Sequence, residues 1–132
     1  MSCRYEGDNN RSVESQVEQC NEAGEWRPLV IGNDSPGFLI FVYSLLSCQH
    51  LYMVLNAAER GLLLERAEGH LELVGDQGWM LQTLKVAFTG RLRSGTPTAE
   101  DIAYIEQRMN QCPVSRNIHA AGAHTSTLVL QP

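Results

Sequence analysis

Two cysteines carry the most reactive chemistry in this sequence, because a thiolate is a nucleophile and can be oxidised reversibly. Cys48 lies in the middle of an uncharged stretch, and Cys112 opens the run CPVSRNI far downstream. Cys3 and Cys20 are expected to be small, partly buried side chains of the N-terminal region. The four cysteines are too few for a disulfide scaffold, and their spacing fits no metal site. Widely spaced cysteines are usually inert core residues and less often catalytic, so both interpretations stay open for Cys48 and Cys112.

The element that must position Cys48 is a long helix. Residues 35–58 contain no Asp, Glu, Lys or Arg, and apolar side chains fall on nearly every face of a helix drawn through them. Pro36 suits the first turn, and the preceding Asp34 or Ser35 is expected to cap the N-terminus. Gly61 is expected to end the helix in the left-handed conformation. The sequence therefore predicts one uninterrupted helix between Pro36 and Gly61.

A helix that spans a bilayer is the alternative, because a span needs about 20 predominantly apolar residues. Ser44, Ser47, Gln49 and His50 stand at the centre of this stretch, where polar groups are most costly in lipid. We therefore expect a helix in a protein core and no membrane partner. A helix that is apolar on all faces is wrapped by protein on most sides, and one chain of 132 residues struggles to supply that cover. The pattern favours a homodimer.

Alternating apolar and polar residues predict strands around this helix. Strands are expected over residues 2–6 (an edge strand), 12–18, 26–31 and 125–130. Two longer runs, 65–74 and 80–92, flank a Gly-rich turn and predict an antiparallel hairpin. Its inward side chains are expected to be Ala67, Gly69, Leu71 and Leu73 in the first strand, and Leu84, Val86 and Phe88 in the second.

Cys112 is predicted to lie where two helices meet. Thr98 is expected to cap a helix whose apolar face carries Met109 and Cys112 at helical spacing. Pro113 disfavours helical geometry at Cys112 and suits the first position of a new short helix over residues 113–118. If Cys112 caps that short helix, its sulfur faces free backbone N–H groups, an environment that favours a thiolate.

Cys48 has a different predicted environment, because apolar surroundings raise the pKa of a thiol. It would need a cation or hydrogen-bond donors to become reactive. Arg27, Arg116 and His119 are the candidates that the fold would have to bring to it. His50 is two residues away and points elsewhere on an isolated helix.

The composition excludes several classes of function. The net charge is -5, from 10 basic and 15 acidic side chains, and no cluster of Lys or Arg indicates a nucleic-acid partner. No pattern of Cys and His indicates a metal, and no cofactor is expected. The N-terminus carries no charged-then-apolar signal sequence, so a cytoplasmic location is expected.

The two cysteine segments resemble those of one known family. The stretch SPGFLIFVYSLLSCQHLYMVLNAAERGL is similar to the central helix of the OsmC/Ohr family, the osmotically inducible and organic hydroperoxide resistance proteins, and QCPVSRNI is similar to its second-cysteine motif. The resemblance covers essentially the whole chain, as a single OsmC-like domain over residues 1–132. It implies an α+β fold with antiparallel sheets wrapped around a long central helix, in an intertwined homodimer with active sites at the subunit interface.

The resemblance also implies an activity, a thiol-dependent peroxidase. By this resemblance Cys48 is the peroxidatic cysteine, which attacks an organic hydroperoxide or hydrogen peroxide and becomes a sulfenic acid. Cys112 is the resolving cysteine, which converts that acid to a disulfide. A dithiol reductant, a lipoyl protein or a small thiol, then restores both. An apolar lining from Phe38, Phe41 and Met109 would favour an organic hydroperoxide.

One departure from the family pattern concerns the cation at the peroxidatic cysteine. Active members place a glutamate early in the first-cysteine helix, where it pairs with an arginine, whereas this chain has Pro-Gly-Phe-Leu over residues 36–39. Arg27 is the expected cation, from the partner subunit, and His50 is the alternative. A site without that glutamate also fits a second function, a small-ligand-binding or redox-sensing protein that does not turn over peroxide.

Overall fold

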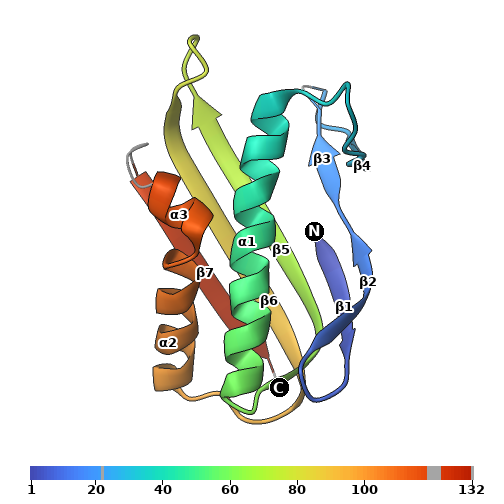
Figure 1. The fold of residues 1–132 in the computed structure, drawn as a ribbon, viewed down its shortest axis with the longest axis vertical. Helices are drawn as coiled ribbons and strands as arrows, with labels where there is room; N and C mark the ends of the chain where they lie inside the picture. Colours follow the sequence, from blue (N-terminus) through green and yellow to red (C-terminus); the bar gives the residue numbers. More distant parts are fainter. Residues whose placement is uncertain (22, 119–122, 132) are drawn as a thin grey trace.

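A computed structural model describes residues 1–21, 23–118 and 123–131. In chain order the elements are β1 (Ser2–Glu6), β2 (Arg11–Gln16), β3 (Glu18–Cys20), β4 (Trp26–Pro28), α1 (Gly37–Glu59), β5 (Leu63–Gly75), β6 (Leu81–Ser94), α2 (Ala99–Asn110), α3 (Pro113–Ile118) and β7 (Ala123–Gln131). They form one layer of strands and one layer of helices (Figure 1).

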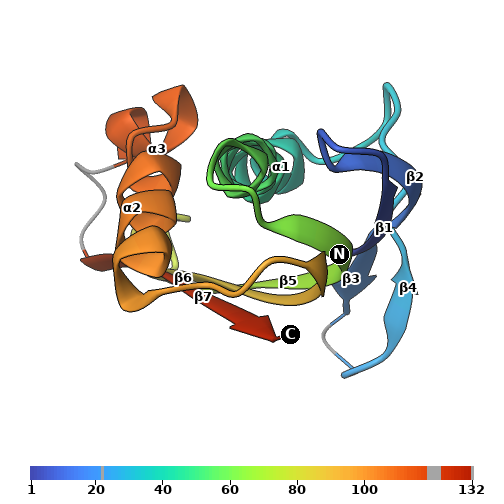
Figure 2. The ribbon, with the colours of Figure 1, turned by 90° about the horizontal axis from the view of Figure 1, so that it is seen from below.

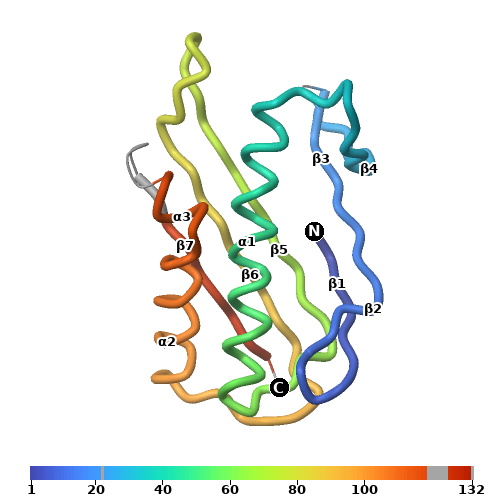
Figure 3. Tube along the Cα trace, in the orientation of Figure 1, coloured from blue at the N-terminus to red at the C-terminus, as the bar shows by residue number. Residues whose placement is uncertain are grey.

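The main sheet has five strands in the order β2-β1-β5-β6-β7. β5 and β6 form the antiparallel hairpin that the sequence predicts, and β1 pairs antiparallel with both β2 and β5. β7, however, runs parallel to β6. The sheet is therefore mixed, and the expectation of a purely antiparallel sheet is wrong. The reason is the connection: after β6 the chain returns through α2 and α3, the crossover that a parallel pair requires (Figure 3).

The N-terminal strands differ from their predicted arrangement. β1 is not an edge strand, because β2 folds back through the turn after Glu6 and covers its outer side. The strand expected over residues 12–18 divides at Val17 into β2 and β3. The strand expected over residues 26–31 ends at Pro28, and only the Leu29 N–H, which donates to the Val17 carbonyl at 2.8 Å, continues the pairing beyond it in the described chain. β3 and β4 therefore form a separate two-stranded ribbon beside the first half of α1 (Figure 1).

All three helices lie on one face of the main sheet, and β1 and β2 curl up beside α1 (Figure 2). The hairpin faces them with the predicted alternation: Ala67, Gly69, Leu84, Val86 and Phe88 are buried and Leu71 is partly buried. Leu73 was expected to point inward, but it is 39% exposed. The physical reason is that the hairpin extends past the end of the helix layer, so the helices cover less of the last part of β5 (Figure 1).

Close packing of α1 on the sheet depends on Gly69. A Cβ atom at this position would lie 2.6 Å from a ring carbon of Phe88 and 3.3 Å from a methyl carbon of Leu46 on α1. Real Cβ atoms essentially never approach at the shorter distance. The glycine thus lets the Phe88 ring and α1 occupy the space that a larger residue would take.

The α1 helix matches its predicted span but not its predicted cap. Pro36 takes the N-cap position and no side chain caps the helix. Ser35 instead stabilises the preceding turn, because its hydroxyl accepts from the Gly32 N–H at 2.9 Å and donates to the Val30 carbonyl. The C-terminal prediction is confirmed, since Gly61 has a φ of 70°.

One face of α1 has no cover within the described chain. Its core face is formed by Val42, Leu45, Leu46, Gln49, Met53, Val54, Asn56 and Ala57. On the side away from the sheet, Phe41 is 42% exposed, Leu51 53% and Leu55 55%, and Figure 2 shows no described element over it. By length and composition this helix could also cross a membrane, a test that the core helix of a soluble protein passes too. We call the line of Ile40, Phe41, Leu51 and Leu55 the open face of α1.

Candidate functional site

Cys112 is placed by the end of one helix and the start of the next. Helix α2 begins at Thr98 with a capping box: the Thr98 hydroxyl accepts from the Asp101 N–H, and the Asp101 carboxylate accepts from the Thr98 N–H. Ile105 and Met109 bury its apolar face, and Cys112, fully buried, follows the helix by two residues. This part of the predicted architecture is confirmed, including the span of α3.

The sulfur of Cys112 caps α3, as the sequence predicts. The backbone N–H of Ser115 donates to Cys112 Sγ at 3.3 Å. The Ser115 hydroxyl lies 3.0 Å from the same sulfur. Both groups are fully buried. Cys112 therefore has two polar neighbours from Ser115, in a site that excludes water.

Cys48, in the middle of α1, lies against this helix start. Its side chain hydrogen-bonds with that of Cys112, and the backbone N–H of Val114 donates to the Cys48 sulfur. The first turn of α3 thus donates one N–H to each sulfur. Both cysteines are free thiols, Cys48 partly exposed and Cys112 buried. The fold therefore brings together two sulfurs that lie far apart in the sequence, with the outer one open to solvent.

The pKa of the Cys48 thiol lies above its usual value. Burial is the largest cause, followed by the hydrogen bond from Cys112, with the charge on Cys112 a smaller one. The N–H of Val114 acts in the opposite direction but does not outweigh them. Among the described residues, therefore, Cys48 favours the protonated thiol, and none of the groups that shift its pKa is a cation that could activate it.

Arg27 does not provide that group within the same chain. It lies on β4, exposed, and its guanidinium binds the Glu25 carboxylate at 2.7 Å. The ribbon of β3 and β4 stands on the side of α1 opposite α2 and α3 (Figure 1). Arg116 is exposed on α3, and His119 lies outside the described residues.

His50 cannot serve as the cation either. Its Nε2 hydrogen-bonds with the Tyr5 hydroxyl, and its ring stacks on that of Tyr5 with centroids 5.9 Å apart. Burial, and to a smaller extent the charge of the N-terminus, lowers the pKa of His50 to about 4. The imidazole is therefore neutral at neutral pH. The expectation that His50 could replace the arginine is wrong, because the helix directs it toward the sheet.

The apolar surroundings of Cys48 also differ from expectation. Met109 is fully buried in the core and does not line an approach to the thiol. Phe38 is partly buried and Phe41 is exposed, with ring centroids 6.2 Å apart, and their role as a lining of the approach to Cys48 stays a prediction. The hairpin tip adds Trp79, whose ring meets that of Phe38 edge-on at 5.5 Å. The aromatic group beside the first half of α1 thus consists of Phe38, Phe41 and Trp79.

Three polar residues to which the sequence analysis gave no role at the site, Gln49, Ser115 and Ser126, form a chain of hydrogen bonds that ends at the buried sulfur. Gln49 is fully buried, and its Nε2 donates to Ser115 Oγ at 2.8 Å. Ser126 of β7 donates to Gln49 Oε1 at 2.9 Å. A glutamine in the middle of an uncharged helix was the available signal, because a buried amide needs hydrogen-bond partners. The two partners described here lie 66 and 77 residues away, so only the fold identifies them.

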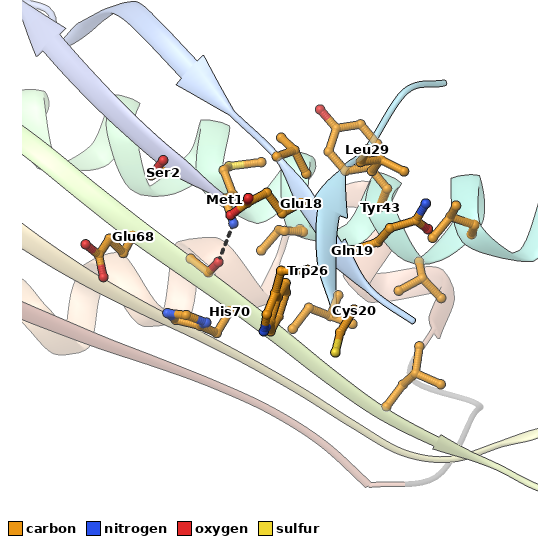
Figure 4. Close-up of a pocket in the computed structure, with 17 residues that line it drawn as sticks. Met1, Ser2, Glu18, Gln19, Cys20, Trp26, Leu29, Tyr43, Glu68 and His70 are labelled. Atoms are coloured by element: carbon orange, nitrogen blue, oxygen red, sulfur yellow. Dashed lines mark hydrogen bonds between the residues drawn. The ribbon is translucent and has the colours of Figure 1, made fainter. Parts of the chain in front are cut away.

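A separate cavity of about 630 Å³ lies between the β3–β4 ribbon, α1 and β5 (Figure 4). Its lining includes Trp26, Leu39, Tyr43 and His70, and neither Cys48 nor Cys112. The thiol of Cys20 reaches it and is exposed rather than partly buried as expected, whereas Cys3 is buried. Among the described residues no group of three or more His, Cys, Asp or Glu side chains could hold a metal ion.

No protein-family model and no curated protein matches the sequence. The structure, in contrast, is similar to several solved structures. An OsmC-like protein from Mycoplasma pneumoniae matches with a TM-score of 0.59 at 10% identity, over 89% of this chain and 96% of that one. A hypothetical protein from Aquifex aeolicus matches with a TM-score of 0.59 at 7% identity, over 92% and 98%.

A third similar structure is an OsmC-like protein of unknown function from Vibrio cholerae. It matches with a TM-score of 0.50 at 14% identity, over 86% of this chain and 84% of that one. At such identities a structural match shows the arrangement of the elements and carries no information on activity. The resemblance inferred from the two cysteine segments is thus confirmed at the level of architecture. The chain has the α+β fold of the OsmC-like proteins.

Proposed function

We propose that this protein is a thiol-dependent peroxidase of the OsmC/Ohr type, with Cys48 as the peroxidatic and Cys112 as the resolving cysteine. The contact between the two sulfurs carries the proposal. Cys48 is partly exposed and can meet a substrate, while Cys112 is buried directly behind it. A two-cysteine cycle needs one sulfur that meets the oxidant and a second one within reach of the first.

The proposed cycle has three steps. The Cys48 thiolate attacks the outer oxygen of a hydroperoxide, so that an S–O bond forms and the O–O bond breaks. The alkoxide takes a proton and leaves as an alcohol, while Cys48 becomes a sulfenic acid. The Cys112 sulfur then attacks that of Cys48, and the hydroxyl group leaves as water with the Cys112 proton. A dithiol, a lipoyl protein or a small thiol, exchanges with the disulfide and returns both thiols.

A homodimer would complete this site. The open face of α1 exposes a row of large apolar side chains next to Cys48, and water-exposed rows of this kind mark interfaces. Among the described residues, none of the groups that shift the pKa of this thiol is a cation, and its raised pKa makes one necessary. We propose that Arg27 of a second copy supplies it.

Glu25 is the proposed substitute for the glutamate that the first-cysteine helix lacks. Its carboxylate accepts from the Asn21 amide at 3.0 Å and from the Arg27 guanidinium at 2.7 Å. These two hydrogen bonds, that of Asn21 first, lower the pKa of Glu25, so the carboxylate stays charged at neutral pH. A charged carboxylate that also accepts a hydrogen bond from Asn21 is held in place, and it therefore restricts the directions in which the Arg27 guanidinium can point.

The test is stopped-flow consumption of cumene hydroperoxide with dihydrolipoamide as reductant. We expect Cys48→Ser to abolish consumption and Cys112→Ser to stop it after a single turnover, with the sulfenic acid trapped by dimedone. Cys20→Ser is the matched control, since this exposed thiol lies away from the sulfur pair, and it should keep full activity. Turnover that survives Cys48→Ser would refute the proposal.

The second candidate is a small-ligand-binding or redox-sensing protein without peroxidase turnover. Two observations favour it: the raised pKa of Cys48 and a cavity of about 630 Å³ that does not include the thiols. That volume lies in the range of small-molecule sites, about 300–1,000 Å³. Native mass spectrometry of the purified protein would reveal a retained ligand. A bound compound together with no consumption of cumene hydroperoxide would favour this function.

A further inference from the structure

A buried chain of hydrogen bonds joins the two segments that carry the cysteines. Gln49 directly follows Cys48 on α1, and its Nε2 donates to Ser115 Oγ at 2.8 Å. Ser115 stands three residues after Cys112, and its hydroxyl oxygen lies 3.0 Å from Cys112 Sγ. The exposed fraction of Gln49, Ser115 and Cys112 is zero. The polar contacts of the buried sulfur are thus set by a residue of the helix that carries the other cysteine.

The hydrogen of the Ser115 hydroxyl has two acceptors within reach. One is Cys112 Sγ, and the other is the Met109 carbonyl oxygen at 3.3 Å. The Gln49 nitrogen cannot take this hydrogen, because an amide nitrogen only donates. Its own hydrogen bond instead holds the Ser115 oxygen in place. The hydroxyl therefore either points at the sulfur or turns back to the end of α2.

Oxidation of the two cysteines to a disulfide changes which acceptor is more favourable for the Ser115 hydroxyl. A reduced sulfur, above all a thiolate, accepts a hydrogen bond from a hydroxyl, whereas a disulfide sulfur is a poor acceptor. In the reduced protein the Ser115 N–H donates to the Cys112 sulfur, and the Ser115 hydroxyl hydrogen-bonds with the same sulfur, donating to a thiolate or accepting from the thiol S–H. In the disulfide the hydroxyl can turn to the Met109 oxygen and remain bonded. The contact with sulfur therefore stabilises the reduced pair more than the disulfide.

We propose that Ser115, held by Gln49, is a positioning residue that stabilises reduced Cys112 and makes a Cys48–Cys112 disulfide easier to reduce. A dithiol whose reduced form is stabilised is a stronger oxidant as a disulfide, so its reductant regenerates it more readily. The inference rests on the cysteine pairing of the proposed function. It does not depend on a hydroperoxide as the oxidant.

The experiment measures the thiol–disulfide equilibrium in mixtures of reduced and oxidised dithiothreitol. Free thiols are trapped with iodoacetamide, and peptide mass spectrometry identifies the Cys48–Cys112 pair. For Ser115→Ala we expect the equilibrium constant to shift toward the disulfide by about fivefold, a potential about 20 mV more negative. Gln49→Met, of similar volume, should shift it in the same direction. Urea unfolding of each variant separates a redox effect from a loss of stability.

Two serine variants serve as controls. Ser115→Thr keeps the hydroxyl and should stay within about twofold of the unaltered protein, because the hydrogen bond to sulfur is retained. Ser126→Ala removes a hydroxyl that touches only the far end of the Gln49 amide among the described contacts, and it should also stay within about twofold. A role in packing alone would instead lower stability in all of these variants and leave the potential unchanged.

The outcomes separate this inference from the proposed function. An equilibrium constant for Ser115→Ala within twofold of the unaltered protein would overturn the inference. If Ser115→Ala does not fold, an unshifted constant for Gln49→Met overturns it in the same way. A shift in a protein that consumes no hydroperoxide would support the inference and refute the peroxidase. A protein that forms no Cys48–Cys112 disulfide with diamide, a stronger oxidant than oxidised dithiothreitol, would refute both.

Discussion

His50 should make the stability of this protein depend on pH. In the folded chain burial lowers its pKa to about 4, against 6.5 for a histidine in water. The unfolded chain therefore binds one proton more between these two values, and unfolding becomes easier as the pH falls. The contribution is fully present above pH 6.5 and is lost progressively toward pH 4. Over the whole range from pH 6.5 to pH 4 and below, the difference between the two pKa values corresponds to a loss of about 3 kcal/mol in the free energy of unfolding.

Urea unfolding at pH 7 and pH 5 measures this contribution before most carboxylates become protonated. Over that interval the free energy of unfolding should fall by about 2 kcal/mol because of His50 alone. His50→Gln provides the comparison, since an amide can still bond the Tyr5 hydroxyl but does not titrate. We expect the pH dependence, rather than the stability at pH 7, to differ between the two proteins. Equal falls in both proteins would show that His50 is not held neutral by burial.

Three further predictions concern packing, capping and the proposed cation. Gly69→Ala should lower the free energy of unfolding by about 1–3 kcal/mol in urea, because the added methyl group has no room. Thr98→Ala should lower it by about 1 kcal/mol, since the capping box with Asp101 is lost. Glu25→Gln should slow hydroperoxide consumption about 10-fold or less, and Arg27→Ala should slow it more, in the dimer that we propose.

Each of these predictions has a matched control. Gly32→Ala places the same methyl group in open space and should change stability by less than about 0.5 kcal/mol. Thr98→Ser retains a capping hydroxyl and should recover most of the loss. Glu14→Gln removes a carboxylate of β2 that is paired with Arg4 of β1, and it should leave consumption unchanged. A Gly69→Ala protein as stable as Gly32→Ala would contradict the packing argument.

Local patterns were sufficient for the elements that position the cysteines. The span of α1 followed from an uncharged stretch bounded by Pro36 and Gly61, and the hairpin followed from its period of two. α3 and its sulfur cap followed from a cysteine before a proline. These features depend on side chains within a few residues of one another, so the sequence displays them directly.

The predictions that were wrong depended on contacts between residues that lie far apart in the sequence. β1 looks like an edge strand until β2 pairs beside it, and β7 becomes parallel to β6 only because two helices intervene. In the sequence His50 is a possible cation, but in the fold its Nε2 hydrogen-bonds with the hydroxyl of Tyr5, 45 residues away. Burial then lowers its pKa, and burial is a property of the assembled core rather than of any short segment.

By itself, the sequence determined that one cysteine lies within a long helix and the other between two helices of an α+β chain, because helix caps, periodicity and turns are local. Only the tertiary structure decided that the sulfurs of Cys48 and Cys112 meet, since no spacing encodes a contact across 64 residues. It also decided that Ser115 contacts the buried sulfur and that Gln49 bonds Ser115. The physical reason is that buried polar groups must find partners, and the folded core alone settles which ones are within reach.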